Sequence, residues 1–587
     1  MDVNPKETKP FIAWIEKVWR YLNYGKWRFA IIFPLMLLGL YALYFAFIYK
    51  TSPSSGSADA SYWTDPRQWA FRIVLGLVDI GLVVLMIRRF FTRKLTFHEA
   101  ALILSALAMS VIVSYSFGTP IYDYGITWNQ HDLYYASGSA VDYGSGHFGL
   151  IMTIFKTGKI PAILQDSEGN YLFDFSSVVE RYQPKTFYFV SAAFMKFNSL
   201  FIHAGDAVVA VSGSTAYGLT QTDWALFESL RILYCFMELV QIYFIYKIFQ
   251  RLRFAKAPLL VAYGVAIFTP IWCYFANWAN NDGMSAFFAV LAIYFLLGFM
   301  KRKDWVDVVG LAASIGLSMS CKLGGALVAL VALPFLLWAF VRSFRDKTWR
   351  KVTLQGVVFA LIVFPLGLGW PLYNYFKFGQ PILFFSPVDN SSLYISNTNF
   401  FDRFIWYPNA DVFRIIYVYH SNADAPAYYQ DTSLITALLK TSFYGEYGFG
   451  RSDVQLFLIY LFGSLLFFVS LLAVPFLAVK AFIRKRFLDG PRALFLALVF
   501  FIMYGWAVWF VARYPYTCNE DIRYVPLLIL PVAGLLGSLV QSLEEPGEGK
   551  AAKLQKVVHD SLMGLTACYA FGVVLAYLSL SAWYYRV

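Results

Sequence analysis

Charged residues are scarce in this chain, and their scarcity excludes most classes of soluble protein. Only 14% of the 587 residues are Asp, Glu, Lys or Arg, whereas 59% are hydrophobic. Apolar runs of about 20 residues recur along the chain, and a helix of that length crosses the hydrocarbon layer of a membrane. A membrane β-barrel would instead need short segments in which apolar and polar residues alternate. The sequence therefore predicts an all-α polytopic membrane protein.

Cysteine is also scarce, and its spacing excludes two further classes of site. The five cysteines lie far apart and no pair has CxxC spacing, so neither a zinc site nor a disulfide framework is indicated. The net charge of +12 does not indicate a nucleic-acid partner, because the basic residues sit in short loops between apolar runs. That placement is typical of cytoplasmic loops. The first apolar run follows a polar, basic segment and is interpreted as a retained signal anchor.

The alternation of apolar runs and basic loops predicts about 13 transmembrane helices and two large extracytoplasmic loops. The predicted order is as follows: a cytoplasmic segment at 1–27, spans 1–3 within 28–117, the first large loop at 118–225, spans 4–9 within 226–371, the second large loop at 372–453, and spans 10–13 within 454–587.

The first large loop contains two apolar segments that we interpret as interfacial helices. Residues 147–160 have apolar side chains at helical spacing, which predicts an amphipathic helix on the outer membrane surface. Residues 186–202 are apolar enough to be a span. A full crossing there would place Arg251, Arg253 and Lys256 outside, however, so a shallow interfacial or re-entrant helix is favoured.

Residues 121–148, directly after the third apolar run, concentrate unusual polar chemistry. They hold three aspartates, two of the six histidines, Trp128 and five tyrosines, but no Lys or Arg. An acidic and aromatic segment at a membrane exit is suited to holding a polar substrate beside the lipid surface. We therefore expect the rest of the chain to act as a scaffold for this segment.

Six short motifs follow one another on the predicted outer face. They are QHDLYY (130–135), YQPKTFYFVSA (182–192), NNDG (280–283), GLSMSCKLGG (316–325), WPLYNYFKFGQP (370–381) and NEDIRYVPLLILP (519–531). Together they resemble motifs of the GT-C superfamily of membrane glycosyltransferases, of the type of protein O-mannosyltransferases and aminoarabinose transferases (glycosyltransferase family 39-like). The chain departs from that pattern in having two extra spans before the first loop and no obvious Asp-Glu pair.

This resemblance implies an inverting transfer of one sugar from a polyprenyl-phosphate donor to an extracytoplasmic acceptor, which could be a glycan, a lipid or a protein. Such a transfer needs a base for the acceptor hydroxyl and positive charge for the departing phosphate. Asp132 is the first candidate for the base, because it lies in the QHD motif where the family keeps an aspartate. Asp123 is the second candidate, and either could instead be a turn former. His131 could orient Asp132 or bind substrate.

Other residues are candidates for substrate binding. Lys322 and Arg523 are expected to bind the phosphate, although Lys322 could simply snorkel to the interface and Arg523 could pair with a neighbouring carboxylate. Asp282 could bind sugar hydroxyls or a cation, or it could cap a helix. Glu446 and Trp128 complete the predicted set. Some members of the superfamily use a divalent cation, but no local cluster of ligands requires a metal here.

Two other classes remain open from the sequence. A multi-pass transporter or lipid-linked sugar flippase would need charges along a path through the spans, and Asp79 and Glu238 are the intramembrane candidates. A non-catalytic membrane scaffold or receptor would use the outer loops as binding surfaces. The short inner loops favour a bacterial cell membrane. The sugar and the acceptor are not predicted.

Overall fold

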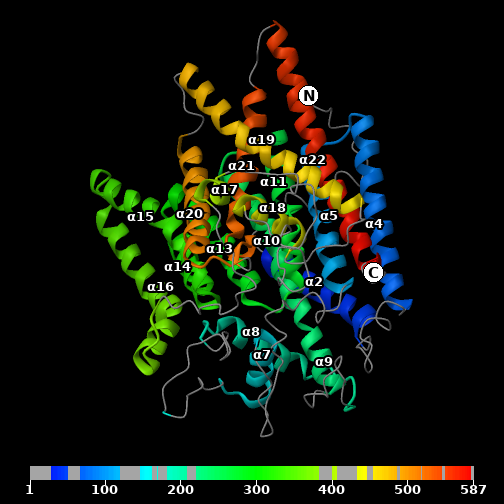
Figure 1. The fold of residues 1–587 in the computed structure, drawn as a ribbon, viewed down its shortest axis with the longest axis vertical. Coiled ribbons are helices and arrows are strands. Elements are labelled where there is room, and N and C mark those ends of the chain that lie inside the picture. Colours follow the sequence, from blue (N-terminus) through cyan, green and yellow to red (C-terminus); the bar gives the residue numbers. More distant parts are fainter. Residues whose placement is uncertain are drawn as a thin grey trace.

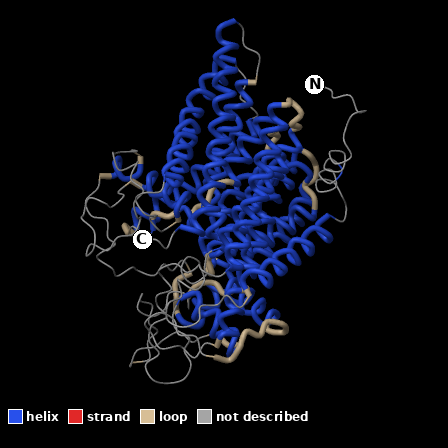
Figure 2. The backbone as a smooth tube through the Cα atoms, turned by 90° about the vertical axis from the view of Figure 1, so that its right-hand side faces the viewer, coloured by secondary structure: helices blue, strands red, loops and turns tan. Residues whose placement is uncertain are grey.

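The computed structural model describes thirteen parts of the chain, and the elements in those parts are all helices (Figure 2). The described residues are 17, 28–49, 66–118, 146–160, 168, 182–207, 220–382, 399–405, 433–445, 454–484, 490–516, 519–544 and 549–583. The prediction of an all-helical polytopic membrane protein is confirmed.

Eleven helical segments of the described chain are long and apolar enough to cross a membrane, or up to twelve if one bent pair is a single span. The segments are Phe29–Ile48, Pro66–Phe91, Phe97–Gly118, Gln221–Arg251, Asn281–Arg302, Leu323–Arg345, Trp349–Phe378, Phe457–Phe482, Gly490–Arg513, Pro526–Leu543 and Gly549–Leu578. The bent pair is α11 (Lys256–Ile267) and α12 (Ile271–Asn277), which meet at an angle of 46°.

The predicted number of about 13 spans exceeds by one or two the number of segments that are this long and apolar. The excess comes from α14 (Trp305–Cys321), which the sequence predicted to be a span. With 17 residues, α14 is about 25 Å long, and it runs back along α13 (Asn281–Arg302), against which it packs. The remaining predicted spans coincide with the long helices or with the bent pair.

Helix α10 (Leu230–Arg251) runs through the middle of the bundle and is buried along most of its length. It packs against α5 (Phe97–Gly118), α12 and α13 (Asn281–Arg302). At two edges of the bundle lie α4 (Pro66–Phe91) and α16 (Trp349–Phe378), which carry exposed apolar side chains (Figure 1). Such a surface is stable only against lipid or another protein.

Three short helices gather at one end of the bundle: α7 (Gly146–Thr157), α8 (Thr186–Asn198) and α9 (Gln221–Glu228) (Figure 1). Helices α7 and α8 correspond to the two predicted interfacial segments, and they pack against each other. Since α8 has 13 residues, it is only about 20 Å long and is too short for a full crossing.

Helix α13 defines the two ends of the bundle. Asn281 begins the helix and Arg302 ends it, and 22 residues separate the two ends by about 33 Å. Helices α7, α8 and α9 lie toward the end marked by Asn281, which we call the site end. The basic residues Lys301, Arg302 and Lys303 mark the opposite end, which we call the basic end. The assignment of these ends to the two sides of the membrane remains a prediction.

Candidate functional site

Three cations and two carboxylates gather at the site end, from parts of the chain that lie far apart in sequence. Lys322 forms an ion pair with Asp282, and its ammonium lies 4.6 Å from the centroid of the Tyr524 ring. The Nε of Arg523 lies 3.9 Å from a carboxylate oxygen of Asp282 and 3.8 Å from one of Asp521. Asp282 is therefore shared by two cations.

The NNDG motif places Asp282 at the start of α13. Asn280 is the N-cap residue, with extended backbone, and its side chain accepts a hydrogen bond of 3.0 Å from the Asp282 amide. Asp282 thus lies in the first turn of the helix, where the helix dipole stabilises a negative charge. Because Asn280 supplies the cap, the Asp282 carboxylate is left to pair with Lys322 and Arg523.

The turn after α14 places Lys322. The helix ends at Cys321, Lys322 is extended, and the short helix η5 (Leu323–Ala326) follows at once. A Cβ on Gly325 would lie only 2.4 Å from the backbone carbonyl carbon of Ser318. Only glycine permits this close approach of η5 to the end of α14. The glycine thus fixes the turn that presents Lys322 to Asp282.

Lys185, which the sequence did not single out, is the third cation of the cluster. It is 3% exposed and donates a 2.6 Å hydrogen bond to the backbone carbonyl of Gln183. Its ammonium lies 4.9 Å from the ring centroid of Trp370 and 5.5 Å from that of Tyr188, which are attractive cation–π distances. The side chain of Gln183 in turn accepts a hydrogen bond from Asn281, at the start of α13.

Asn281 links the two chain segments that carry Lys185 and Lys322. Its amide also donates a 3.1 Å hydrogen bond to the carbonyl of Cys321, the residue before Lys322. A further link comes from Asn374, which donates at 3.3 Å to the carbonyl of Tyr182. The motifs at 182–192, 280–283, 316–325, 370–381 and 519–531, which the sequence placed on one face, are thus joined by direct contacts.

His147 is a second residue that the sequence did not assign to the site. Its Nδ1 lies 2.8 Å from the Tyr188 hydroxyl, and the two rings stack with centroids 5.7 Å apart. Burial lowers the pKa of His147 well below its ordinary value of 6.5, and the positive charges of Lys322, Arg523 and Lys185 lower it further. The imidazole is therefore neutral at neutral pH, and all three cations lie close enough to act on it.

Burial also shifts the pKa of two charged members of the cluster. It lowers the pKa of Lys322, and the nearby Asp282 carboxylate opposes that change. It raises the pKa of Asp521, and Arg523 opposes that change. With Lys185, Lys322 and Arg523 against Asp282 and Asp521, these five groups carry one positive charge in excess. A desolvated excess of this kind favours an anionic ligand.

The contacts of two residues, Lys322 and Arg523, bear on the alternatives that the sequence left open for them. Lys322 does not simply snorkel, because it pairs with a buried carboxylate. Arg523 does lie near Asp521, as the structural alternative requires, but it also faces Asp282. Glu520 is instead 3.5 Å from Arg403 of α17 (Phe400–Phe404).

Five predicted site residues lie outside the described residues. They are Asp123, Trp128, His131, Asp132 and Glu446. The structure describes the residues that border these gaps. His147, at the start of α7, follows the gap that contains Asp123, Trp128, His131 and Asp132. Gly445, directly before Glu446, has a φ of +65° and packs against the rings of Tyr274 and Trp278.

The two intramembrane carboxylates that a transporter would need have partners nearby. Ser110 of α5 donates a 2.9 Å hydrogen bond to Asp79 of α4. Gln241 donates a 3.0 Å hydrogen bond to Glu238 on the same helix, α10. Both carboxylates therefore have hydrogen bonds within the helix bundle, which was one of the two interpretations of them from the sequence.

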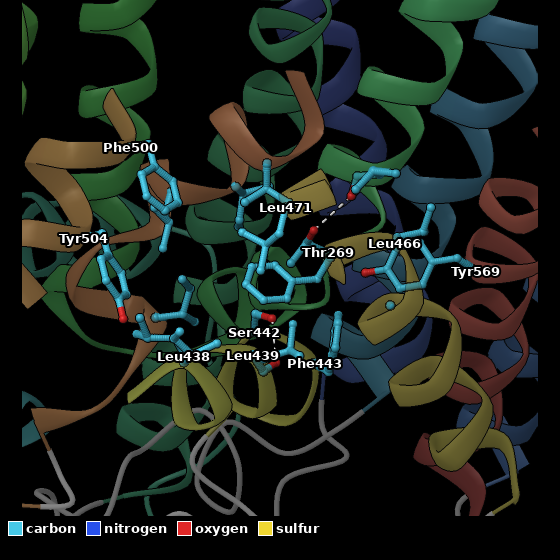
Figure 3. A pocket seen from close by; sticks show the side chains of 18 of the residues that line it. Thr269, Leu438, Leu439, Ser442, Phe443, Leu466, Leu471, Phe500, Tyr504 and Tyr569 are labelled. Carbon is cyan, nitrogen blue, oxygen red and sulfur yellow. Dashed lines mark hydrogen bonds between the residues drawn. The ribbon is translucent and has the colours of Figure 1, made fainter. Parts of the chain in front are cut away.

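An apolar cavity of about 250 Å³ lies beside the cluster, between α18 (Leu434–Tyr444), α19 (Val454–Arg484), α20 (Gly490–Arg513) and α21 (Ile529–Leu543) (Figure 3). Its lining is mainly Leu, Phe and Ile, and the hydroxyls of Thr269 and Ser442 are bonded to the backbone. Ile522 also lines the cavity and directly precedes Arg523. The cavity lining and the cationic cluster therefore include residues that are neighbours in the chain.

The described residues of the site do not fit a divalent cation. Among the described parts of the chain, no group of three His, Cys, Asp or Glu side chains could hold a metal ion. The two carboxylates of the cluster, Asp282 and Asp521, both face Arg523.

Comparison with known protein families gives a match in the middle of the chain. Residues 224–370, which include Asp282 and Lys322, match the family model described as dolichyl-phosphate-mannose-protein mannosyltransferase. No curated protein is significantly similar to the chain in sequence.

Two solved structures are similar to the chain: ArnT from Cupriavidus metallidurans in the apo state and the same protein bound to undecaprenyl phosphate. The apo structure is 13% identical, covers 74% of this chain and 70% of its own, and has a TM-score of 0.35. The bound structure is 13% identical, covers 82% and 76%, and has a TM-score of 0.32. The family match agrees with the class predicted from the sequence: residues 224–370, about a quarter of the chain, are similar to the protein mannosyltransferases, which are membrane glycosyltransferases.

Proposed function

We propose that this protein transfers one sugar from a polyprenyl-phosphate donor to a hydroxyl of an extracytoplasmic acceptor. The description of the matched family names a donor of this kind, since dolichyl phosphate is a polyprenyl phosphate. The site end of the bundle would be the active face, and a bacterial cell membrane is the proposed location.

The observation that carries this proposal is the excess of positive charge in a desolvated cluster. A polyprenyl-phosphate sugar has one negative charge on its phosphodiester, and the phosphate that leaves gains a second. Lys185, Lys322 and Arg523 would stabilise the charge that develops as the bond to the sugar breaks. The cluster already holds Lys322 and Arg523 in place through Asp282 and Asp521, so little reorganisation of these two cations is needed during the reaction.

The same end of the bundle offers polar groups for a sugar. The side-chain nitrogen of Asn280 and the side-chain oxygen of Asn281 are buried without a hydrogen-bond partner. Buried amides of this kind are normally satisfied, so each is suited to a sugar hydroxyl or a water. The indole of Trp370 and the phenol ring of Tyr188 provide apolar faces beside Lys185.

The prenyl chain of the donor would enter the apolar cavity beside Ile522. Its phosphate would then lie near Arg523, because the two residues are adjacent. An apolar cavity within the spans is a suitable environment for a hydrocarbon chain, since burial there removes the chain from contact with water.

The base in this proposal is Asp132, with Asp123 as the second candidate. The carboxylate would take the proton of the acceptor hydroxyl as its oxygen bonds to the anomeric carbon. The phosphate would leave with the bonding electrons, which inverts the configuration at that carbon. His131 would orient the base, and Trp128 and Glu446 would contact the substrate.

The test is turnover by the purified full chain in lipid with a panel of polyprenyl-phosphate sugars, measured as released polyprenyl phosphate. We expect release with one sugar, its loss in Asp132→Asn, and a loss of about 100-fold in Lys322→Gln and Arg523→Gln. Asp142→Asn, in the same loop, is the matched control and should retain turnover. No release across the panel, with or without cell-envelope extract as acceptor, would rule out this function.

A further inference from the structure

At the basic end of the bundle, two connections between helices form one surface. One joins α13 to α14, and the other joins α15 (Leu327–Arg345) to α16. The side chain of Gln355 donates a 3.0 Å hydrogen bond to the carbonyl of Lys303, and the ammonium of Lys303 lies 3.6 Å from Asp346. These contacts hold the two connections together.

This surface carries a strong excess of positive charge. Its cations are Lys301, Arg302, Lys303, Arg342, Arg345, Lys347, Arg350 and Lys351, and its carboxylates are Asp304, Asp307 and Asp346. Eight cations against three carboxylates leave five positive charges in excess. We call these residues the basic patch.

Three of the eight cations are engaged with the carboxylates of the patch. Arg302 binds Asp307 through two nitrogens, the shortest distance being 2.8 Å, and Arg342 lies 3.4 Å from Asp346, which also faces Lys303. The other five make no ion pair with a described residue and are exposed. They are Lys301, Arg345, Lys347, Arg350 and Lys351.

Two other cations at the basic end, Arg251 and Arg492, hold helices together instead. The guanidinium of Arg251 lies over the Tyr294 ring at 3.5 Å. Arg492 donates to Gln541 at 2.7 Å and to the carbonyl of Leu252 at 3.4 Å. The structural use of these residues contrasts with the five exposed cations of the basic patch, which have no such role in the described chain.

Exposed aromatic and apolar side chains place the basic patch at the membrane surface. Trp338 is 51% exposed and lies 5.1 Å from the Arg342 guanidinium, and Trp349 is 43% exposed and stacks on Phe344. Exposed Trp at the end of a span is typical of the level of the lipid headgroups. Directly beside these residues, Leu337 and Val341 are 55% and 68% exposed, as lipid-facing side chains are.

We propose that the basic patch binds the headgroups of anionic phospholipids. Five unpaired cations at headgroup level face the one layer in which phosphate groups are densely arranged, and basic clusters next to spans attract anionic lipids. The patch lies at the opposite end of α13 from the cationic cluster of the candidate site, so this inference does not depend on the proposed function.

The test is lipid binding to the full chain in detergent, measured by native mass spectrometry with added phosphatidylglycerol or phosphatidylcholine of the same chain length. We expect phosphatidylglycerol to bind more tightly. The triple variant Arg345→Gln/Arg350→Gln/Lys351→Gln should reduce that binding about tenfold or more, since each cation near a headgroup contributes several-fold to affinity.

The matched control is Lys550→Gln/Lys553→Gln/Lys556→Gln, on the exposed first turns of α22 (Gly549–Trp583), which removes the same charge outside the patch. It should retain the preference for phosphatidylglycerol. Equal binding of both lipids by the unmodified chain would overturn the proposal, and that measurement needs no variant. Equal loss in the two triple variants would also overturn it, because net charge alone would then explain the binding.

Discussion

The ion pair between Lys322 and Asp282 gives a quantitative test of the site, because the two residues can be changed separately and together. Asp282→Asn would leave Lys322 and Arg523 facing each other in a desolvated cluster. Removing one partner of a buried pair typically costs about 3–5 kcal/mol in the free energy of unfolding. Since Arg523 keeps Asp521 at 3.8 Å, we expect the lower end of that range, about 3 kcal/mol.

Lys322→Gln should cost less, about 1–2 kcal/mol, because Asp282 keeps a cationic neighbour, with Arg523 at 3.9 Å. The double variant removes both charges, so its loss should be smaller than the sum of the two single losses by about 1.5–3 kcal/mol. The measurement is equilibrium unfolding in mixed micelles with increasing dodecyl sulfate, for the four proteins of the cycle.

The matched control is the pair of Lys303 and Asp346, which are 3.6 Å apart but partly exposed to solvent. A cycle of Lys303→Gln and Asp346→Asn should give a coupling below about 0.5 kcal/mol. Additive losses at Lys322 and Asp282 would refute our account of the cluster, because the two groups would then not depend on each other.

The cycle also predicts a dependence on pH. Burial makes the pKa of Lys322 lower in the folded chain than its ordinary value of 10.5. The folded state therefore binds fewer protons than the unfolded state between those two values, and the free energy of unfolding rises with pH in that interval. In Asp282→Asn, the carboxylate that opposes the lowering of the Lys322 pKa is gone. The loss in free energy of unfolding relative to the unmodified chain should therefore be largest at neutral pH and shrink as the pH approaches 10.5.

Three further predictions concern other parts of the site end. His147→Gln should flatten the pH dependence of the melting temperature below pH 6.5, because folding lowers the pKa of His147 and the stability linked to its neutral form is lost as the pH falls from that value. Gly445→Ala should destabilise the fold by about 1–2 kcal/mol, measured by the same unfolding titration, because Gly445 has a φ of +65° and its Cβ would lie 3.2 Å from the Tyr274 ring. Arg523→Lys should lower release of polyprenyl phosphate about tenfold, since lysine keeps the charge but loses the planar donor set that also reaches the Tyr524 hydroxyl at 2.9 Å. Unchanged turnover in Arg523→Lys would indicate that only the charge matters.

The helices, and the face on which the polar motifs lie, could be predicted from the sequence for one physical reason. Apolar length and the position of basic residues both follow from the thickness and surface of the membrane, and these are local properties of the chain. Each polar motif at a helix end could therefore be assigned to one face. The structure then brought Asp282, Lys322 and Arg523 together, although 241 positions separate the first from the last.

Lys185 and His147 could not be predicted in the same way, because their roles depend on how helices pack. The contact of Asn281 with Gln183 joins residues 98 positions apart, and that of Asn374 with Tyr182 joins residues 192 apart. No local sequence pattern predicts a contact between residues that are so far apart in the chain. A signal was nevertheless present: Lys185 directly follows the proline of the YQPK motif, and a charged residue beside an apolar helix on the predicted active face warrants testing as a ligand.

Helix α13 connects the two charged surfaces and explains why they can be tested independently. Its first turn carries Asp282, and its last turn carries Arg302, about 30 Å away. At ordinary salt, charges interact through solvent over only about 8–10 Å. Changes in the basic patch should therefore leave the pH dependence of the Lys322 and Asp282 cycle unaltered. A shift in that dependence caused by Arg350→Gln would mean that the two ends are coupled through the packing of α13, α14 and α16 rather than through charge.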